Sequence, residues 1–357
     1  MNDNEINDKR DQKSFRGITF SKFKKSDAKK EFLKSIINGK IEQSCYWLAE
    51  FICAGHLSEV WDLLLSVMSK NIHLGNPKLP IYIELRFNDF KNIVHNGYIG
   101  NEIKLRNNSR IRKMFAEIVS IMCLSTKKLA FKNIKIPKED YNITNISYKL
   151  KADNINYGQR VYKNEDPKEL FISINEFAYH LSKKSNNTQQ ACYWLEWMLG
   201  YETLCFKETK VKKQAGRRNM PVESKLQKET IWILWELILF ESQDRNKLVY
   251  KIVTSLLNLF CIKYTTGCKK KRKDLIYFAI SLITETPKLE IKICKNNRKT
   301  SEISKKIDII YKQIKKNEVK PETDYLFNNS FTKGNLEKTI SKLDRMDQLL
   351  GMVTRKD

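Results

Sequence analysis

Two clusters of basic residues have the types and spacing that could do chemistry in this sequence. One is a run of five consecutive cations after Cys268, and the other lies around the segment 214–216. The first contains Lys269, Lys270, Lys271, Arg272 and Lys273, and the second contains Lys207, Lys210, Lys212, Lys213, Arg217 and Arg218. Like charges held close together repel one another, and phosphate groups relieve that repulsion while counterions are released. Both clusters therefore predict contact with the phosphate backbone of a nucleic acid, without readout of the bases.

Two other interpretations of these clusters remain open. The run after Cys268 also fits a short nuclear-localisation pattern, and either cluster could be a solvated loop without a ligand. The chain of 357 residues carries a formal net charge of +25, with 52 Lys against only 14 Arg, so part of this charge can reflect A/T-rich codons. No aromatic residues are interleaved with the cations in sequence, and base-specific RNA recognition is therefore not predicted.

The eight cysteines and four histidines are scattered, and neither C-x-x-C nor H-x-x-x-H occurs. Structural zinc sites usually contain two close pairs of ligands. Cys205, Cys261 and Cys268 come closest to such a pattern, but their spacing is too wide for paired zinc ligands. We therefore expect them to be ordinary buried thiols. We expect no metal, no cofactor and no catalytic residue. An enzyme of unrecognised type is the least favoured class.

The elements that must position the basic clusters are predicted to be helices. Apolar residues recur at helical spacing, and the sequence contains only 12 Gly and 7 Pro, so the expected fold class is all-α. The sequence divides into a polar disordered tail (1–27), a first helical unit (28–125), an irregular connector (126–164), a second helical unit (165–286) and a C-terminal extension (287–357). Asp166 and Pro167 are expected to start a helix.

Finer expectations concern the less regular segments. The connector has alternating fragments that could form a short hairpin, and Leu289, Ile291 and Ile293 alternate like an edge strand. An amphipathic helix from Leu336 to Leu350 is expected to dock on its own domain, with a short coiled-coil seam as the alternative. The longest apolar run is too short to cross a bilayer. The charged start of the chain contains no signal peptide, which favours an intracellular protein.

A tetrapeptide occurs twice, 147 residues apart. Cys-Tyr-Trp-Leu stands at Cys45, Tyr46, Trp47 and Leu48, and again at Cys192, Tyr193, Trp194 and Leu195, each time after an amphipathic segment and a polar turn. Tryptophan is rare, so the match predicts that the two helical units are an internal duplication. The alternative is two unrelated core helices. The tryptophan-bearing faces are expected to be mostly core, with an exposed partner groove as the other possibility.

Residues 32–79 carry a further pattern: Lys34-Ser35-Ile36, then Tyr46-Trp47-Leu48-Ala49, then Ala54-Gly55, then Leu74-Gly75-Asn76-Pro77. This segment resembles the start of the C-terminal helical domain of the RarA/MgsA family, AAA+ proteins related to clamp loaders. The family has a pair of arginines where this chain has Asp62-Leu63-Leu64, and an acidic pair where it has Lys70-Asn71. G-x-x-x-x-G-K-[ST] occurs nowhere, so no phosphate-cradling loop of that type is expected.

What the resemblance implies is a collar-like helical module without its ATPase. The chain as a whole also resembles uncharacterised proteins of large nucleocytoplasmic DNA viruses. The sequence therefore predicts a non-enzymatic module associated with DNA replication or genome handling. It would bind a replication-type protein partner through its helices and nucleic-acid backbone through its Lys-rich loops, in the cytoplasm, a viral factory or the nucleus. The alternative is a structural or virion-associated protein with no specific DNA role.

Overall fold

The computed structural model describes residues 4–131 and 134–319, and these residues form an all-α protein. Within these ranges the backbone forms no strand, only an isolated bridge between Ile18 and Lys24. The predicted all-α class is confirmed. The predicted helix from Leu336 to Leu350 lies outside the described residues.

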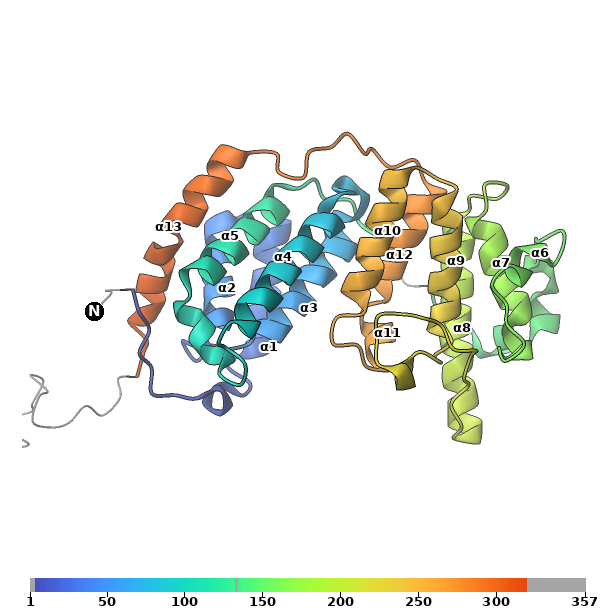
Figure 1. Cartoon of the computed structure of the whole chain (residues 1–357), viewed down its shortest axis with the longest axis horizontal. Coiled ribbons are helices and arrows are strands. Elements are labelled where there is room, and N and C mark those ends of the chain that lie inside the picture. Colours follow the sequence, from blue (N-terminus) through green and yellow to red (C-terminus); the bar gives the residue numbers. More distant parts are fainter. Residues whose placement is uncertain (1–3, 132–133, 320–357) are drawn as a thin grey trace, which may run out of the picture.

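The helices of the first unit pack side by side (Figure 1), and their buried apolar residues belong to a core that continues into the second unit. Its helices are α1 (Lys25–Ile37), α2 (Ile41–Cys53), α3 (Leu57–Val67), α4 (Leu79–His95) and α5 (Ser109–Leu124). Gly55 has φ +76° directly after α2, the left-handed conformation in which glycine ends a helix without a steric cost. The unit therefore follows the helical periodicity of its sequence.

The second unit repeats this arrangement with α7 (Phe171–Leu181), α8 (Thr188–Thr209), α9 (Ile231–Gln243), α10 (Lys247–Phe260) and α12 (Lys273–Thr284). In each unit the first helix packs on the second and the third, and the second packs on the last. Cys-Tyr-Trp-Leu lies on the second helix both times, with its Cys and Leu buried. This parallel is what a duplication would produce, and common ancestry of the units stays a prediction.

The tryptophans are mostly core, as predicted. Four of them, Trp194, Trp197, Trp232 and Trp235, belong to the largest fully buried side chains, and Trp61 is also buried. Trp47 is the exception, because it is half-buried and packs edge-on against the exposed Phe23. The tryptophan faces therefore hold each unit together.

The expected disordered tail is wrong for residues 4–24. Ile6, Phe15 and Phe20 are buried in the core. The Arg10 guanidinium lies over the rings of Phe15 and Phe20, 4.8 Å from each centroid. These apolar residues are too irregularly spaced to give a periodic signal, which is why the pattern along the chain predicts a tail.

The connector and the C-terminal extension contain helical turns where the sequence allows strands. The connector forms η5 (Lys138–Tyr141), η6 (Ile143–Lys149) and α6 (Asn156–Gln159), and no hairpin among its described residues. Residues 289–293 are irregular, since no neighbouring strand satisfies their backbone. α13 (Asn297–Lys315) then crosses back to pack on α5 and α2 of the first unit (Figure 1).

Candidate nucleic-acid interface

The run from Lys269 to Lys273 occupies a short helix, α11 (Cys268–Lys271), and the start of α12. Lys269 is buried, with its ammonium hydrogen-bonded to Glu202 and 3.8 Å from Glu229. Lys273 lies 2.6 Å from the Glu196 carboxylate. These two cations therefore neutralise carboxylates of their own fold.

Arg272 is also used internally, and the remaining two lysines are exposed. Arg272 donates to the backbone carbonyls of Phe260 and Ile262 and forms a 3.0 Å ion pair with Asp62. Lys271 is exposed but pairs with the same Asp62. Lys270 is exposed and pairs with no carboxylate of the described residues. The prediction that all five residues contact a ligand needs correction, because a buried, paired cation cannot reach a phosphate.

Arg218 in the second cluster needs the same correction. Its guanidinium binds both Asp166 carboxylate oxygens, at 2.8 and 2.7 Å, and its Nε donates to Glu236 at 2.6 Å. Only 1% of its side chain is exposed, and none of that of Asp166. Asp166 is therefore a buried ion-pair partner. The predicted helix start is close to the observed one, because Pro167 precedes η7 (Lys168–Leu170), which runs directly into α7.

The other members of the second cluster lie at the surface or near it. Lys213 pairs with Glu169 at 2.7 Å, and this hydrogen bond raises the pKa of Lys213. Arg217 donates to the Gln227 side chain at 2.8 Å. Lys207, Lys210 and Lys212 are exposed. The cluster thus retains three lysines that can reach a ligand.

The two clusters meet on either side of the C-terminal half of α8. One hollow of about 360 Å³ is lined by Lys212, Lys213, Lys269 and Lys270 among others. A second, of about 370 Å³, is lined by Lys207, Lys270 and Lys273 among others. Lys270 and Thr203 belong to both hollows. Figure 1 places α11 and the lower part of α8 together at one edge of the molecule.

Tertiary packing adds lysines that stand outside the two clusters of the sequence. Lys138 of the connector lines one hollow, and Lys225 and Lys228 line the other. Five exposed lysines around the hollows have no ion-pair partner among the described residues, and we call them the lysine face: Lys138, Lys207, Lys212, Lys228 and Lys270. Lys207, Lys212 and Lys270 belong to the two predicted clusters, whereas Lys138 and Lys228 stand apart from any charge run and join them only through folding.

The carboxylates beside the lysine face are partly compensated by an internal cation. Glu202 and Glu229 both line the first hollow, and both lie within ion-pair distance of Lys269. The Tyr264 hydroxyl also donates to Glu229, at 2.9 Å. The buried Lys269 thus removes negative charge that would otherwise oppose an anion, and the exposed lysines dominate the local potential.

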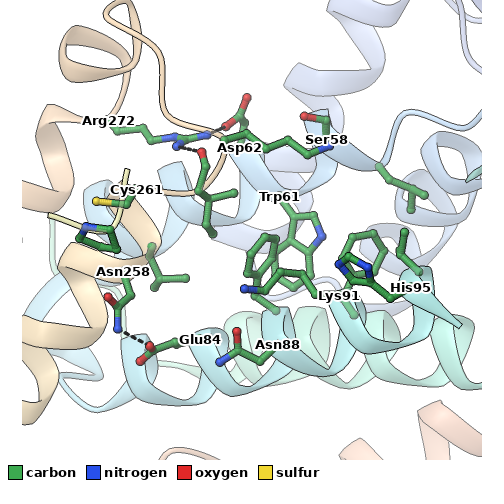
Figure 2. A pocket seen from close by; sticks show the side chains of 18 of the residues that line it. Ser58, Trp61, Asp62, Glu84, Asn88, Lys91, His95, Asn258, Cys261 and Arg272 are labelled. Carbon is green, nitrogen blue, oxygen red and sulfur yellow. Dashed lines mark hydrogen bonds and ion pairs between the residues drawn. The ribbon is translucent and has the colours of Figure 1, made fainter. Parts of the chain in front are cut away.

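A larger cavity than these two hollows lies elsewhere, between the two units. It measures about 580 Å³ and is walled by α3 and α4 on one side and the end of α10 on the other. Figure 2 shows Trp61 in its wall, with two polar links between the units: the Asp62–Arg272 ion pair and a 2.6 Å hydrogen bond from Asn258 to Glu84. Acidic and basic side chains are mixed here, so this cavity does not select for an anion.

Asp62 connects the first unit to the basic run of the second. Burial alone would raise the pKa of Asp62, but hydrogen bonds from Lys271 and Arg272 outweigh it and the pKa is lowered. We expect Asp62→Ala to lower the free energy of unfolding by about 1.5–3 kcal/mol, the usual value for hydrogen bonds to a charged group. Urea denaturation measures this change.

The matched control for Asp62→Ala is Lys271→Ala, which removes the exposed partner only. Because exposed ion pairs contribute about 0–1 kcal/mol, this variant should unfold close to the wild-type midpoint. Equal losses in the two variants would contradict a specific role for the Asp62–Arg272 pair.

The cysteines and histidines form no group of three ligands that could hold a metal ion within residues 4–131 and 134–319. Burial raises the pKa of Cys45 and of Cys261 to about 12, so both remain thiols at neutral pH. Thiols of this kind pack as small apolar groups.

Comparison with known proteins adds no assignment. No protein-family model matches the chain, and no curated protein and no solved structure matches it. None of the helices in the described ranges combines the length and apolar character needed to span a membrane.

Proposed function

We propose that this protein binds the phosphate backbone of nucleic acids through the lysine face, as a non-enzymatic helical module. The observation that carries the proposal is the convergence of lysines from separate segments of the chain on the C-terminal half of α8, next to carboxylates that are already paired. Lysine ammonium groups bind phosphates as point charges. Codon bias alone would scatter lysines and would not neutralise the intervening acids.

The setting of this module in DNA replication or genome handling, and a replication-type protein partner, remain proposals that rest on the resemblance of residues 32–79 to the RarA/MgsA helical domain. Binding of a phosphate backbone by the lysine face requires neither the replication setting nor the protein partner. A structural or virion-associated role would leave the lysines as solvated charge, and the binding experiment separates these two cases.

The test is a salt titration of binding to duplex DNA of mixed sequence, with the full chain. Each phosphate contact contributes about 0.9 to the slope of log affinity against log salt concentration. Replacing all five residues of the lysine face with Ala should therefore make the slope shallower by about 4–5 and weaken binding similarly for every sequence.

A control variant removes five positive charges at positions away from the hollows. Lys104, Lys292, Lys299, Lys305 and Lys306 are exposed, and the last three lie on α13 at the opposite end of the molecule (Figure 1). Their replacement with Ala should leave most of the slope in place. If both variants lose affinity equally, general charge and not the lysine face governs binding; if the wild type does not bind, the proposal is overturned.

A further inference from the structure

An exposed aromatic ring stands within the lysine face. Phe206 lies near the C-terminal end of α8, and 41% of its surface is exposed. It lines the same hollow as Lys212, Lys228 and Lys270. Phe206 belongs neither to the buried core nor to the partly buried hydrophobic residues packed against that core.

The backbone holds this arrangement in place. Lys210 caps α8 in the left-handed conformation, with φ +57°, and its amide donates to the Phe206 carbonyl at 3.0 Å. The chain therefore turns back after α8, so that Lys212 lies beside Phe206 in the hollow. On the other side, buried Lys269 anchors α11 to Glu202 of α8 and so positions Lys270.

A flat apolar ring among unpaired lysines matches the chemistry of a single-stranded nucleic acid. Proteins that bind single strands without sequence preference combine a basic groove for the backbone with aromatic side chains on which bases stack. In a duplex both faces of each base are covered by neighbouring bases, so an exposed ring gains nothing there. Lys212 follows Phe206 closely in the sequence, whereas Lys228 and Lys270 come from other segments and reach the ring only through folding.

We propose that the lysine face binds single-stranded nucleic acid in preference to duplex, with a base stacked on Phe206. The inference rests on the proposed function, since the lysines must hold the backbone for the ring to meet a base. Every base has an aromatic face, so Phe206 confers preference for single strands and not for a sequence.

The experiment measures the affinity of the full chain for an oligothymidylate of about 20 nucleotides and for a duplex of the same length, at one salt concentration. About 20 nucleotides are enough to cover the site sizes of single-strand-binding folds. Wild type should bind the single strand more tightly. Phe206→Ala should weaken single-strand binding about tenfold and change duplex binding by less than about twofold. Phe206→Trp should retain the preference, since the larger ring also stacks.

Phe240→Ala is the matched control, because Phe240 is exposed on α9 and lines neither hollow. It should bind both ligands like wild type, and circular dichroism should show that each variant is folded. Equal affinity for single strand and duplex, unchanged in Phe206→Ala, overturns the stacking inference while the backbone proposal stands. If the lysine-face variant loses affinity for single strand and duplex while Phe206→Ala changes neither, the stacking inference is overturned and the backbone proposal stands. If the wild type binds neither ligand, both proposals are overturned.

Discussion

Arg218→Met should lower the free energy of unfolding by about 3–5 kcal/mol, the usual cost of removing one partner from a buried ion pair. The substitution leaves the Asp166 carboxylate buried without its guanidinium. It also removes the donors to the carbonyls of Val161 and Gly216, at 3.0 and 2.8 Å. Arg218 thus ties the connector to the loop before α9, and its loss separates the two.

The neighbouring Arg217 provides the matched control. It carries the same side chain one residue away, but it is exposed and bonded to Gln227. Arg217→Met should change the free energy of unfolding by less than about 0.5 kcal/mol. Chemical denaturation of both variants measures the difference, and similar values for the two would contradict a buried role for Arg218.

The Asp166–Arg218 ion pair determines how the stability of the fold changes with acid. Burial alone would raise the pKa of Asp166, but Arg218 and the backbone amides of Lys163 and Gly216 outweigh it, so the pKa in the folded state lies below the usual value of 3.8. A lowered carboxyl pKa stabilises the fold above the unfolded pKa, and that contribution is lost as pH falls through the folded pKa. The stability difference between wild type and Asp166→Asn should therefore be constant near neutral pH and shrink below about pH 4.

Asp166 and Arg218 also show where prediction from sequence stops. Asp166 precedes a proline and so resembles a helix start, while Arg218 lies in a basic run and so resembles a surface residue. Local pattern cannot reveal that the two meet across 52 residues. The helices themselves follow from periodicity, because an amphipathic face needs only its own neighbours along the chain.

The candidate site is predictable only in part for the same reason. Exposed members of the basic clusters, such as Lys212 and Lys270, can be found in the sequence because they stand beside other cations. Lys138 and Lys228 cannot, since each stands apart from those runs and reaches α8 only through folding. Phe206 escapes prediction because an isolated aromatic residue on a helix usually belongs to the core.

Trp194→Ala should cost about 3–5 kcal/mol of stability, as expected for removing a fully buried Trp side chain. Trp194 is 0% exposed and packs between the rings of Tyr193 and Trp197. Trp47 is the equivalent residue of the first tetrapeptide but is half-buried. Because less of its surface leaves water on folding, Trp47→Ala should cost about half as much.

Trp194→Phe separates packing from hydrogen bonding at this position. The Trp194 indole nitrogen has no hydrogen-bond partner among the described residues, so replacement by Phe removes volume without breaking a bond. That variant should lose less than Trp197→Phe, which also removes the 2.7 Å bond from the Trp197 indole to the Asp140 carbonyl. Thermal and urea unfolding of these variants provide the comparison.

An equal loss in Trp47→Ala and Trp194→Ala would contradict the difference in burial between the two units. The expected inequality has a physical origin: the connector brings Asp140 and Tyr141 onto α8, whereas Trp47 of α2 is covered mainly by Phe23 and its neighbour Tyr46. The same tetrapeptide therefore packs in two different environments, one on α2 and one on α8. The unit with the more deeply covered tryptophan is also the one whose helix α8 extends past its neighbours to carry the lysine face and Phe206 (Figure 1).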